Sequence, residues 1–253
     1  MPLPLLSHDY DHAVKGPALL LLHSSVCDRR MWDPQWRILL DAGFRVIRCD
    51  FRGHGDTPAA DVPYRDADDV HALLDELDIA ETAVVASSFG GKVALELAAR
   101  WPERVRSLAL LNTASPTHEP SATLRDFDER ETALIEAGDL EGAVELNVST
   151  WLGPEADGNT RAMVRLMQRR AFEVQLAGED VDALPAAFDL GAITARTLAV
   201  SGAHDLPDFR EIAAGLPKVV GGARHTELPW AGHLPNLERP ADTARLVLDF
   251  MSA

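Results

Sequence analysis

Short apolar runs alternate along the chain with segments of helical periodicity. Residues 18–23 (ALLLLH) form a continuous apolar run closed by a polar residue, which is typical of a strand buried on both faces of a parallel sheet. Residues 31–43 instead place large apolar side chains at helical spacing and end at a glycine. This alternation predicts βαβ units around a parallel sheet. It continues through a strand at 44–50, a helix at 66–79, a strand at 82–87, a helix at 89–101 and a strand at 105–112.

The alternation is interrupted over residues 116–190, where no strand-like run occurs. Three helical patterns fill this region, and a helical insertion of this kind is expected to cover the carboxyl edge of the sheet, where open α/β sheets bind ligands. The helical patterns span 123–138, 140–152 and 161–176; afterwards the alternation resumes with a strand at 196–202, a helix near 208–216, a strand at 223–229 and a closing helix at 241–251.

The domain organisation follows from this interruption. The first residues, up to about Lys15, are expected to add short antiparallel edge strands, which makes the strand before the insertion the sixth. We predict an α/β core of residues 1–115 and 191–253, with a mostly parallel central sheet flanked by helices. Residues 116–190 are predicted to form a helical cap inserted after the sixth strand.

Residues 82–105 (TAVVASSFGGKVALELAARWPERV) join a predicted strand to a predicted helix through two serines and two glycines. A sharp strand-to-helix turn with an exposed side chain at its apex needs small residues two positions before and after that apex. Ser88 has Ala86 and Gly90 at these positions, whereas Ser87 has bulky side chains at both. The pattern therefore selects Ser88 as a candidate nucleophile, with alanine replacing the first glycine of G-x-S-x-G. Ser87 is expected to be a hydrogen-bonding structural neighbour.

A serine nucleophile needs a base, and the base needs a third group that orients it. His233 lies in a loop with glycine and proline, between the last predicted strand and the last helix. Asp205 comes just after the strand at 196–202 and can supply the orienting carboxylate, whereas Asp208 is expected to cap the helix that follows it. The resulting candidate triad has the chain order Ser88, Asp205, His233.

The chain resembles the α/β-hydrolase superfamily, as a capped serine esterase or lactonase, over residues 15 to 252 outside the predicted cap. Four stretches carry this resemblance: LLLHSS, DFRGHGDTP, ASSFGGKVALELAARWPERV and GHLPNLERP. The order serine, acid, histidine is also the order expected for this fold. The resemblance implies an α/β-hydrolase fold and acyl chemistry at the triad.

The resemblance also implies an oxyanion hole made by the backbone N–H groups of Phe89 and Ser25. The chain departs from the family at Ser24, where members have a glycine, and a serine restricts the backbone of this loop. The Ser24 hydroxyl either touches the substrate or bonds the backbone of its own loop. Among the apolar residues of the predicted cap, Trp151 alone is expected to face the pocket. An apolar pocket would favour a small or medium uncharged acyl substrate.

The loop DFRGHGDTP allows a second catalytic interpretation, because it contains Arg52, His54 and Asp56. A loop scaffold is favoured, in which the glycines set the turn and Arg52 hydrogen-bonds the backbone. These residues are therefore not assigned to the catalytic set.

The leading functional hypothesis is a serine hydrolase that cleaves a carboxylic ester or lactone through an acyl-enzyme at Ser88. The same machinery could hydrolyse a C–C bond or transfer the acyl group to an acceptor other than water, and no residue separates these reactions. A ligand receptor that keeps the fold for binding is the alternative from another class. A serine at position 88 disfavours the dehalogenase and epoxide-hydrolase branches of the family, which need a carboxylate there.

The composition and charge of the chain limit the kinds of molecule that it is expected to bind. The 253 residues carry a formal charge of −16, which argues against nucleic acid or an anionic membrane as a partner. The two cysteines suggest neither a disulfide framework nor a metal site, and no run approaches the roughly 20 apolar residues of a membrane span. The N-terminus has no secretory pattern. We therefore expect a cytoplasmic protein that acts on a small molecule without a cofactor or metal; the oligomeric state cannot be read from these residues.

Overall fold

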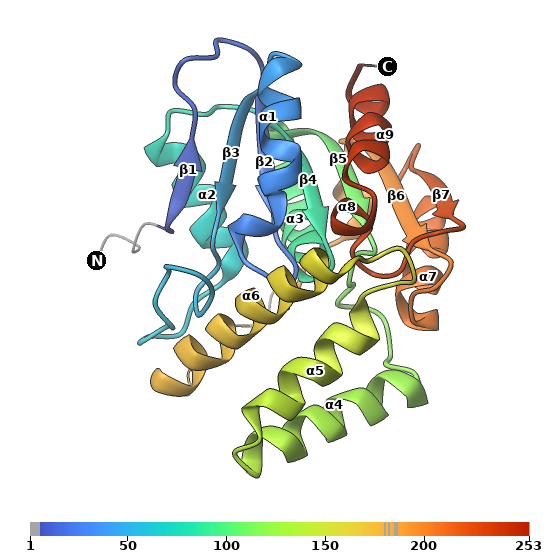
Figure 1. Cartoon of the computed structure of the whole chain (residues 1–253). Coiled ribbons are helices and arrows are strands. Elements are labelled where there is room, and N and C mark those ends of the chain that lie inside the picture. The colour runs from blue at the N-terminus through green and yellow to red at the C-terminus, as the bar shows by residue number, and fades with distance from the viewer. Residues whose placement is uncertain (1–5, 180, 182, 185–186, 253) are drawn as a thin grey trace.

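A mostly parallel sheet forms the centre of the chain in the computed structural model, which describes residues 6–179, 181, 183–184 and 187–252. Seven strands among these residues pair in the order β1-β3-β2-β4-β5-β6-β7, and β1 alone runs antiparallel to its neighbour (Figure 1). The mostly parallel sheet predicted from the alternation is confirmed. The strands are β1 (His8–Tyr10), β2 (Ala18–Leu22), β3 (Arg45–Cys49), β4 (Thr82–Ser87), β5 (Val105–Leu111), β6 (Arg196–Gly202) and β7 (Arg224–Leu228).

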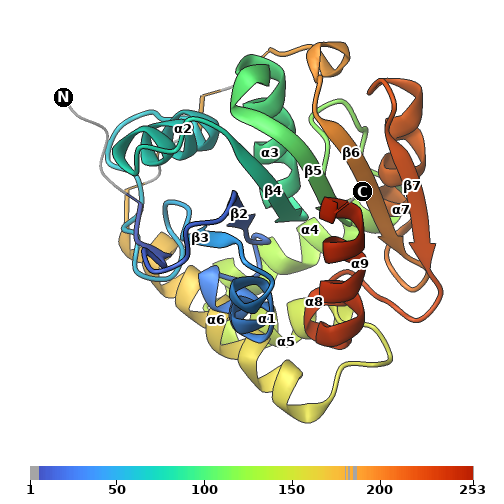
Figure 2. The ribbon, with the colours of Figure 1, turned by 90° about the horizontal axis from the view of Figure 1, so that it is seen from above.

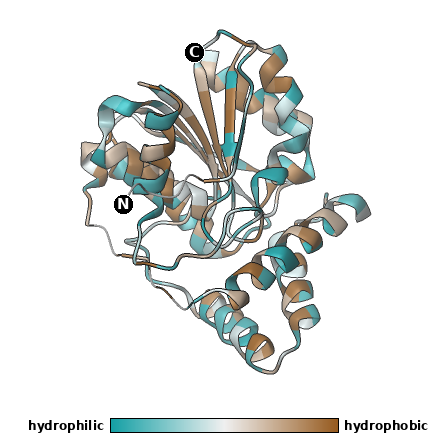
Figure 3. Cartoon of the chain, turned by 90° about the vertical axis from the view of Figure 1, so that its left-hand side faces the viewer, coloured by the Kyte–Doolittle hydropathy of each residue, from teal (hydrophilic) through white to brown (hydrophobic). Residues whose placement is uncertain are grey.

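Helices cover both faces of this sheet. Seen from above, α2 (Asp66–Glu76) and α3 (Phe89–Arg100) lie on one side, and α1 (Asp33–Asp41) and α9 (Pro240–Ser252) lie on the other (Figure 2). The strands are largely apolar and lie between helices of mixed hydropathy (Figure 3). Because successive side chains of a strand point to opposite faces, β4 supplies Ala83 and Val85 to one core cluster and Val84 and Ala86 to the other. Burial on both faces explains the continuous apolar runs.

Shorter helical segments complete the core. α7 (Pro207–Gly215) packs on β6 and β7, and α8 (Pro235–Glu238) precedes α9. The sequence pattern predicted the first of these and missed the second, which is a single turn. The 3₁₀ segments are Arg29–Trp32, Pro102–Arg104, Leu190–Ala192 and Leu216–Lys218.

The N-terminal region contributes one described strand, where the sequence predicted more than one. β1 pairs with β3, and the chain then turns: the Asp11 carboxylate accepts the N–H of Ala13, and Arg45 donates to the carbonyl oxygen of Gly16. Counted over the described strands, the inserted helices therefore follow the fifth strand and not the sixth. Residues 1–5 of the predicted edge region lie outside the described residues.

Within the described residues, three α-helices lie between β5 and β6, as the sequence pattern predicted: α4 (Ala122–Glu136), α5 (Leu140–Trp151) and α6 (Gly158–Ala177). A side-chain oxygen caps the N-terminus of each, from Ser121, Asp139 and Asp157 respectively. α4 and α5 form a hairpin beyond the carboxyl edge of the sheet, and α6 runs across that edge (Figure 1). None of the helices in the described part of the chain has the length and apolar character needed to cross a membrane.

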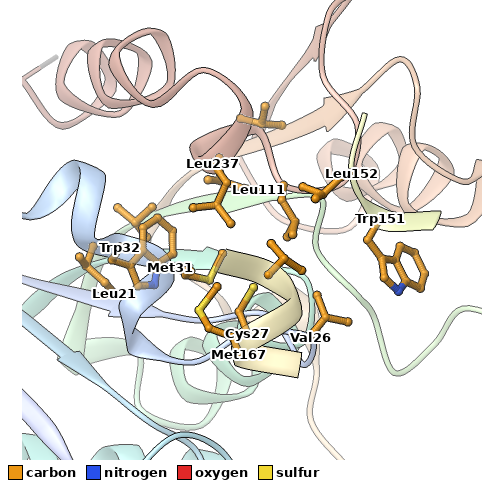
Figure 4. Packing of buried hydrophobic residues seen from close by; sticks show 14 of the residues in the cluster. Leu21, Val26, Cys27, Met31, Trp32, Leu111, Trp151, Leu152, Met167 and Leu237 are labelled. Atoms are coloured by element: carbon orange, nitrogen blue, oxygen red, sulfur yellow. The ribbon is translucent and has the colours of Figure 1, made fainter. Parts of the chain in front are cut away.

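α6 is tied to the rest of the chain by apolar packing. Met167 of α6 belongs to the same buried cluster as Cys27 and Met31, which follow β2 (Figure 4). Trp151 and Leu152 at the end of α5 join the same cluster. The inserted helices therefore share one hydrophobic core with one face of the sheet. The division into a core of residues 1–115 and 191–253 and a cap of 116–190 stays a prediction.

The loop after β3 is held by a buried ion pair. The Arg52 guanidinium donates to both carboxylate oxygens of Asp69 in α2, at 2.6 and 2.8 Å, and both side chains are at most 4% exposed. The expectation that Arg52 hydrogen-bonds the backbone is therefore wrong, because its guanidinium binds the Asp69 carboxylate. In the same loop, the ring nitrogens of His54 lie 3.0 Å from the carbonyl oxygens of Arg52 and Ser25, and Asp56 pairs with Arg29.

We predict that Arg52→Ala lowers the free energy of unfolding by about 3–5 kcal/mol, because Asp69 is left as a buried charge without its partner. Urea unfolding followed by circular dichroism measures this change. Arg37→Ala is the matched control, since the Arg37–Asp41 pair lies in solvent, and we expect a change below about 1 kcal/mol. Equal losses in the two variants would contradict the structural role of the Arg52–Asp69 pair.

Candidate active site

Ser88 stands at a strained turn between β4 and α3. Its backbone has φ 52° and ψ −116°, a conformation that a residue other than glycine rarely adopts. The N–H of Gly90 donates to the carbonyl oxygen of His23 at 3.1 Å, and a Cβ atom at position 90 would lie 2.5 Å from that oxygen. The small residue required two positions after Ser88 is therefore needed because α3 begins against the end of β2.

The two serines of this turn have different surroundings. Ser88 lines a pocket at the carboxyl edge of the sheet. Ser87 is fully buried and does not line it, and its hydroxyl has no hydrogen-bond partner among the described residues. The expectation that Ser87 is a hydrogen-bonding neighbour is therefore wrong: as the last residue of β4, it points into packed surroundings.

His233 and Asp205 are brought into direct contact. His233 Nδ1 lies 2.7 Å from Asp205 Oδ2, and both side chains are at most 2% exposed. The second carboxylate oxygen of Asp205 accepts the N–H of Leu206 at 2.7 Å. With Nδ1 bonded to the carboxylate, His233 keeps Nε2 as the ring nitrogen that can accept a proton. His233 and Ser88 line the same pocket, and no direct hydrogen bond joins these two described residues.

Trp151 packs directly on the histidine. Its ring lies 4.6 Å from the ring of His233, and Phe209 approaches the same imidazole at 4.3 Å. The carbonyl oxygen of Trp151 also accepts the backbone N–H of His233 at 3.1 Å. The end of α5 thus contacts both the ring and the backbone of His233. Trp151 lines the pocket as the sequence predicted, but Phe127 and Phe172 line it as well, so the expectation that Trp151 alone would do so is wrong.

Asp208 lies in the first turn of α7 but does not cap it, so the expected capping role is wrong. The residue at the N-cap position is Leu206, and Asp208 instead accepts from the backbone and hydroxyl of Ser121, at 2.7 and 2.6 Å. His118 Nε2 lies 2.9 Å from the same carboxylate. These contacts lower the pKa of Asp208 against the opposing effect of burial. Asp208 thereby joins α7 to the start of α4, a contact between residues far apart in sequence.

The loop that carries His233 is fixed by two residues that were not predicted from the sequence. The N–H of Gly232 donates to both carboxylate oxygens of Glu238, at 3.1 and 3.0 Å, and burial raises the pKa of Glu238. Asn112 donates to the carbonyl oxygen of Gly232 and accepts the N–H of Gly202, each at 2.8 Å. An asparagine directly after β5 and an acid inside an apolar motif were the signals available for these two positions.

The loop after β2 brings Ser24 and Ser25 to the same pocket as Ser88. Ser24 is not among the described residues with positive φ, so a serine occupies the usual glycine position without that strain. Its hydroxyl is buried and has no partner among the described residues, so it does not bond its own loop. The backbone N–H groups of Ser25 and Phe89 likewise donate to no acceptor in the described part of the chain.

His23 supports this loop as a neutral imidazole. The N–H of Phe51 donates to Nε2 at 3.0 Å, so Nδ1 carries the proton and donates to the carbonyl oxygen of Ser24 at 2.8 Å. Burial lowers the pKa of His23 to about 3. The ring therefore stays uncharged at ordinary pH and fixes the position of Ser24.

The pocket has a volume of about 610 Å³. Aromatic and aliphatic side chains form part of its lining, but acidic and amide side chains also line it, so the expectation of an apolar pocket is corrected. These acidic and amide residues come from the inserted helices, and helical spacing alone could not place them at the pocket. They include Asp128, Glu131, Asn147, Gln168 and Gln175; the apolar residues include Val26, Leu124, Phe127, Trp151, Phe172 and Phe209.

The sequence pattern of the family described as "Alpha/beta hydrolase family" matches residues 19–246. The chain belongs to the α/β-hydrolase family. The predicted fold and resemblance are therefore confirmed, and the chain is a hydrolase of the α/β-fold type.

Relatives of this α/β-hydrolase include a Variovorax paradoxus protein named as a candidate carbamate hydrolase, RutD, which is 33% identical over 98% of this chain and 96% of its own length. The pimeloyl-[acyl-carrier protein] methyl ester esterase of Chromobacterium violaceum is 32% identical over 82% of this chain and 84% of its own. Among solved structures, the enol-lactonase from Burkholderia xenovorans LB400 is 28% identical with a TM-score of 0.79, covering 97% of this chain and 95% of that chain.

We predict that His23 makes this α/β-hydrolase less stable in mild acid. Below its ordinary pKa of 6.5, the unfolded chain binds a proton that the folded chain excludes until about pH 3, so stability falls as pH decreases through this window. From pH 7 to pH 5 the loss attributable to His23 is roughly 2 kcal/mol.

Urea unfolding of wild type and His23→Gln at the two pH values measures this contribution. The variant is expected to be less stable at pH 7 but to lose less stability on acidification. Parallel pH dependences in the two proteins would rule out a neutral buried His23 as the cause.

Proposed function

We propose that this α/β-hydrolase cleaves a carboxylic ester or lactone, with Ser88 as nucleophile, His233 as base and Asp205 as the orienting acid. The Asp205–His233 contact at 2.7 Å, beside the pocket that contains Ser88, is the observation that carries the proposal. The esterase and enol-lactonase among the relatives support this substrate class.

The proposed reaction begins when Ser88 Oγ attacks the acyl carbon and His233 Nε2 accepts the serine proton. The carbonyl oxygen becomes an oxyanion that accepts from the N–H groups of Phe89 and Ser25. The free donors of these two residues support this step, since each oxyanion donor contributes about 3–4 kcal/mol. His233 then gives its proton to the leaving alkoxide, which departs and leaves Ser88 acylated. Water then attacks the acyl carbon while His233 accepts its proton, and His233 returns that proton to Ser88 Oγ as the carboxylic acid product leaves.

We further propose that residues 116–190 act as a cap that completes the pocket over Ser88, with residues 1–115 and 191–253 as the core. Phe127, Trp151 and Phe172 of the three inserted helices line the same pocket as Ser88, which supports this division. Ser24 is proposed to contact the substrate, because its buried hydroxyl lines the pocket without a partner among the described residues.

A carbamate is the second candidate substrate. The relative named as a candidate carbamate hydrolase matches nearly the whole chain, and attack by serine on a carbamoyl carbon uses the same groups. Turnover of an aryl carbamate measured beside the matching aryl ester separates the two candidates. No contact in the described site favours the C–C hydrolase, acyltransferase or ligand-receptor alternatives over ester cleavage.

We predict that Ser88→Ala lowers kcat for a p-nitrophenyl ester by at least about a thousandfold, because the acyl-enzyme cannot form. Ser87→Ala is the matched control on the adjacent residue, and it should keep most of the activity. Release of p-nitrophenol measures both, and circular dichroism establishes that the variants are folded.

A fluorophosphonate probe provides a second measurement of the nucleophile. Mass spectrometry is expected to find the label on Ser88 in wild type and no label in Ser88→Ala. Retained turnover in Ser88→Ala, or labelling at Ser87, would overturn the assignment.

A further inference from the structure

Three of the polar side chains that line the pocket form a set that we call the polar wall: Glu131, Asn147 and Gln168. The three residues come from α4, α5 and α6 respectively, one from each inserted helix. Asn147 and Gln168 are only 1% and 4% exposed. Because polar groups this buried are unfavourable unless they are hydrogen-bonded, their partners decide what the polar wall can bind.

Asn147 is saturated by contacts within the protein. Its Oδ1 accepts from Trp151 Nε1 at 2.9 Å, and its Nδ2 donates to Glu131 Oε1 and to the carbonyl oxygen of Ala143. Asn147 therefore holds the Glu131 carboxyl group in place and has no N–H left to donate to a ligand. The second carboxylate oxygen of Glu131 accepts no hydrogen bond from the described residues.

Gln168 differs from Asn147 because one of its side-chain polar atoms has no hydrogen-bond partner among the described residues. Its Oε1 is buried at the pocket and has no hydrogen-bond partner among the described residues. A buried acceptor of this kind is unfavourable in the empty pocket and gains a partner when a donor enters. Glu131 and Gln168 thus each line the pocket and each have a side-chain oxygen without a partner among the described residues.

The charges around the polar wall disfavour an anion. Asp128 also lines the pocket, and burial together with the Asp128 charge raises the pKa of Glu131. Lys92 lines the pocket from α3, where its positive charge acts on Asp66 at the start of α2. The basic side chain therefore belongs to the core side of the pocket, and the acidic ones belong to the inserted helices.

We propose that the polar wall selects a substrate with a terminal group that donates N–H hydrogen bonds, either a primary carboxamide or an ammonium group. The selected substrate carries no carboxylate or phosphate at that end. The inference rests on the proposed function for the reaction itself and names the substrate class of that site. N–H donors satisfy the free oxygens of Glu131 and Gln168, whereas an anion would be desolvated beside carboxyl groups.

Two series of activated esters test this selection. The first varies the acyl end: the mono-p-nitrophenyl ester of adipic acid, its carboxamide analogue, p-nitrophenyl aminohexanoate and p-nitrophenyl heptanoate. The second varies the alcohol end: the acetates of para-hydroxybenzamide and para-hydroxybenzoate. In at least one series, we expect kcat/KM to be about tenfold or more higher for the carboxamide than for the carboxylate. The faster of the carboxamide and ammonium esters identifies the donor.

Variants of single residues show which side chains cause the preference for the carboxamide ester over the carboxylate ester. Glu131→Gln should reduce the carboxamide-to-carboxylate ratio to about threefold or less, and Gln168→Met should lower kcat/KM for the carboxamide ester more than for the heptanoate. Glu129→Gln, which removes the same charge from an exposed residue of α4 outside the pocket, should leave the ratio unchanged. If Glu131→Gln does not fold, Gln168→Met carries the test.

A wild-type ratio near one in both series would overturn the proposal, as would an equal shift in Glu129→Gln and Glu131→Gln, because net charge alone would then explain the selection. Failure of the underlying function is distinguishable: no ester, heptanoate included, would show turnover that depends on Ser88. Turnover of heptanoate with no discrimination rejects only the polar wall.

Discussion

The start of α3 lies against the end of β2, and the geometry of the site depends on this contact. Gly90 donates its N–H to the carbonyl oxygen of His23, at a distance that leaves no room for a Cβ atom. In the sheet, β2 lies beside β4, but the chain continues from β2 to β3 on one side and from β4 to β5 on the other. The connections therefore leave the carboxyl ends of β2 and β4 in opposite directions, and a crevice opens between these two ends. The contact at Gly90 sets how far Ser88 lies from the loop of Ser24 and Ser25.

The sequence predicted those features that depend on local pattern. Continuous apolar runs marked β2 and β4 because these strands are buried on both faces, and helical spacing marked α4, α5 and α6. The small residues around Ser88 distinguished it from Ser87, since the sharp turn constrains only its nearest neighbours. The contact between Asp205 and His233 is also consistent with prediction, because the carboxyl ends of parallel strands lie at one edge of the sheet.

Contacts between residues that lie far apart in the sequence could not be predicted from local sequence patterns. Asp208 has the spacing of a helix cap, yet its carboxylate bonds Ser121, 87 residues away. Glu238 fixes the backbone beside His233; the pattern GHLPNLERP contains this acid but does not indicate that its partner is the N–H of Gly232. The polar wall escaped prediction for the same reason: helical periodicity identifies which residues share a face, but not which pocket that face meets. Residues 1–5 of the predicted edge region remain outside the described chain.

The contact of Trp151 with His233 bears on how this architecture can be modified. The carbonyl oxygen of Trp151 accepts the backbone N–H of His233, the two rings are packed together, and a Cβ atom on Gly153 would lie 2.4 Å from the nitrogen of Gly232. The end of α5 is therefore built together with the histidine loop. In chimeras that exchange the inserted helices between relatives, residues 151–153 and 231–233 have to be transplanted as one unit.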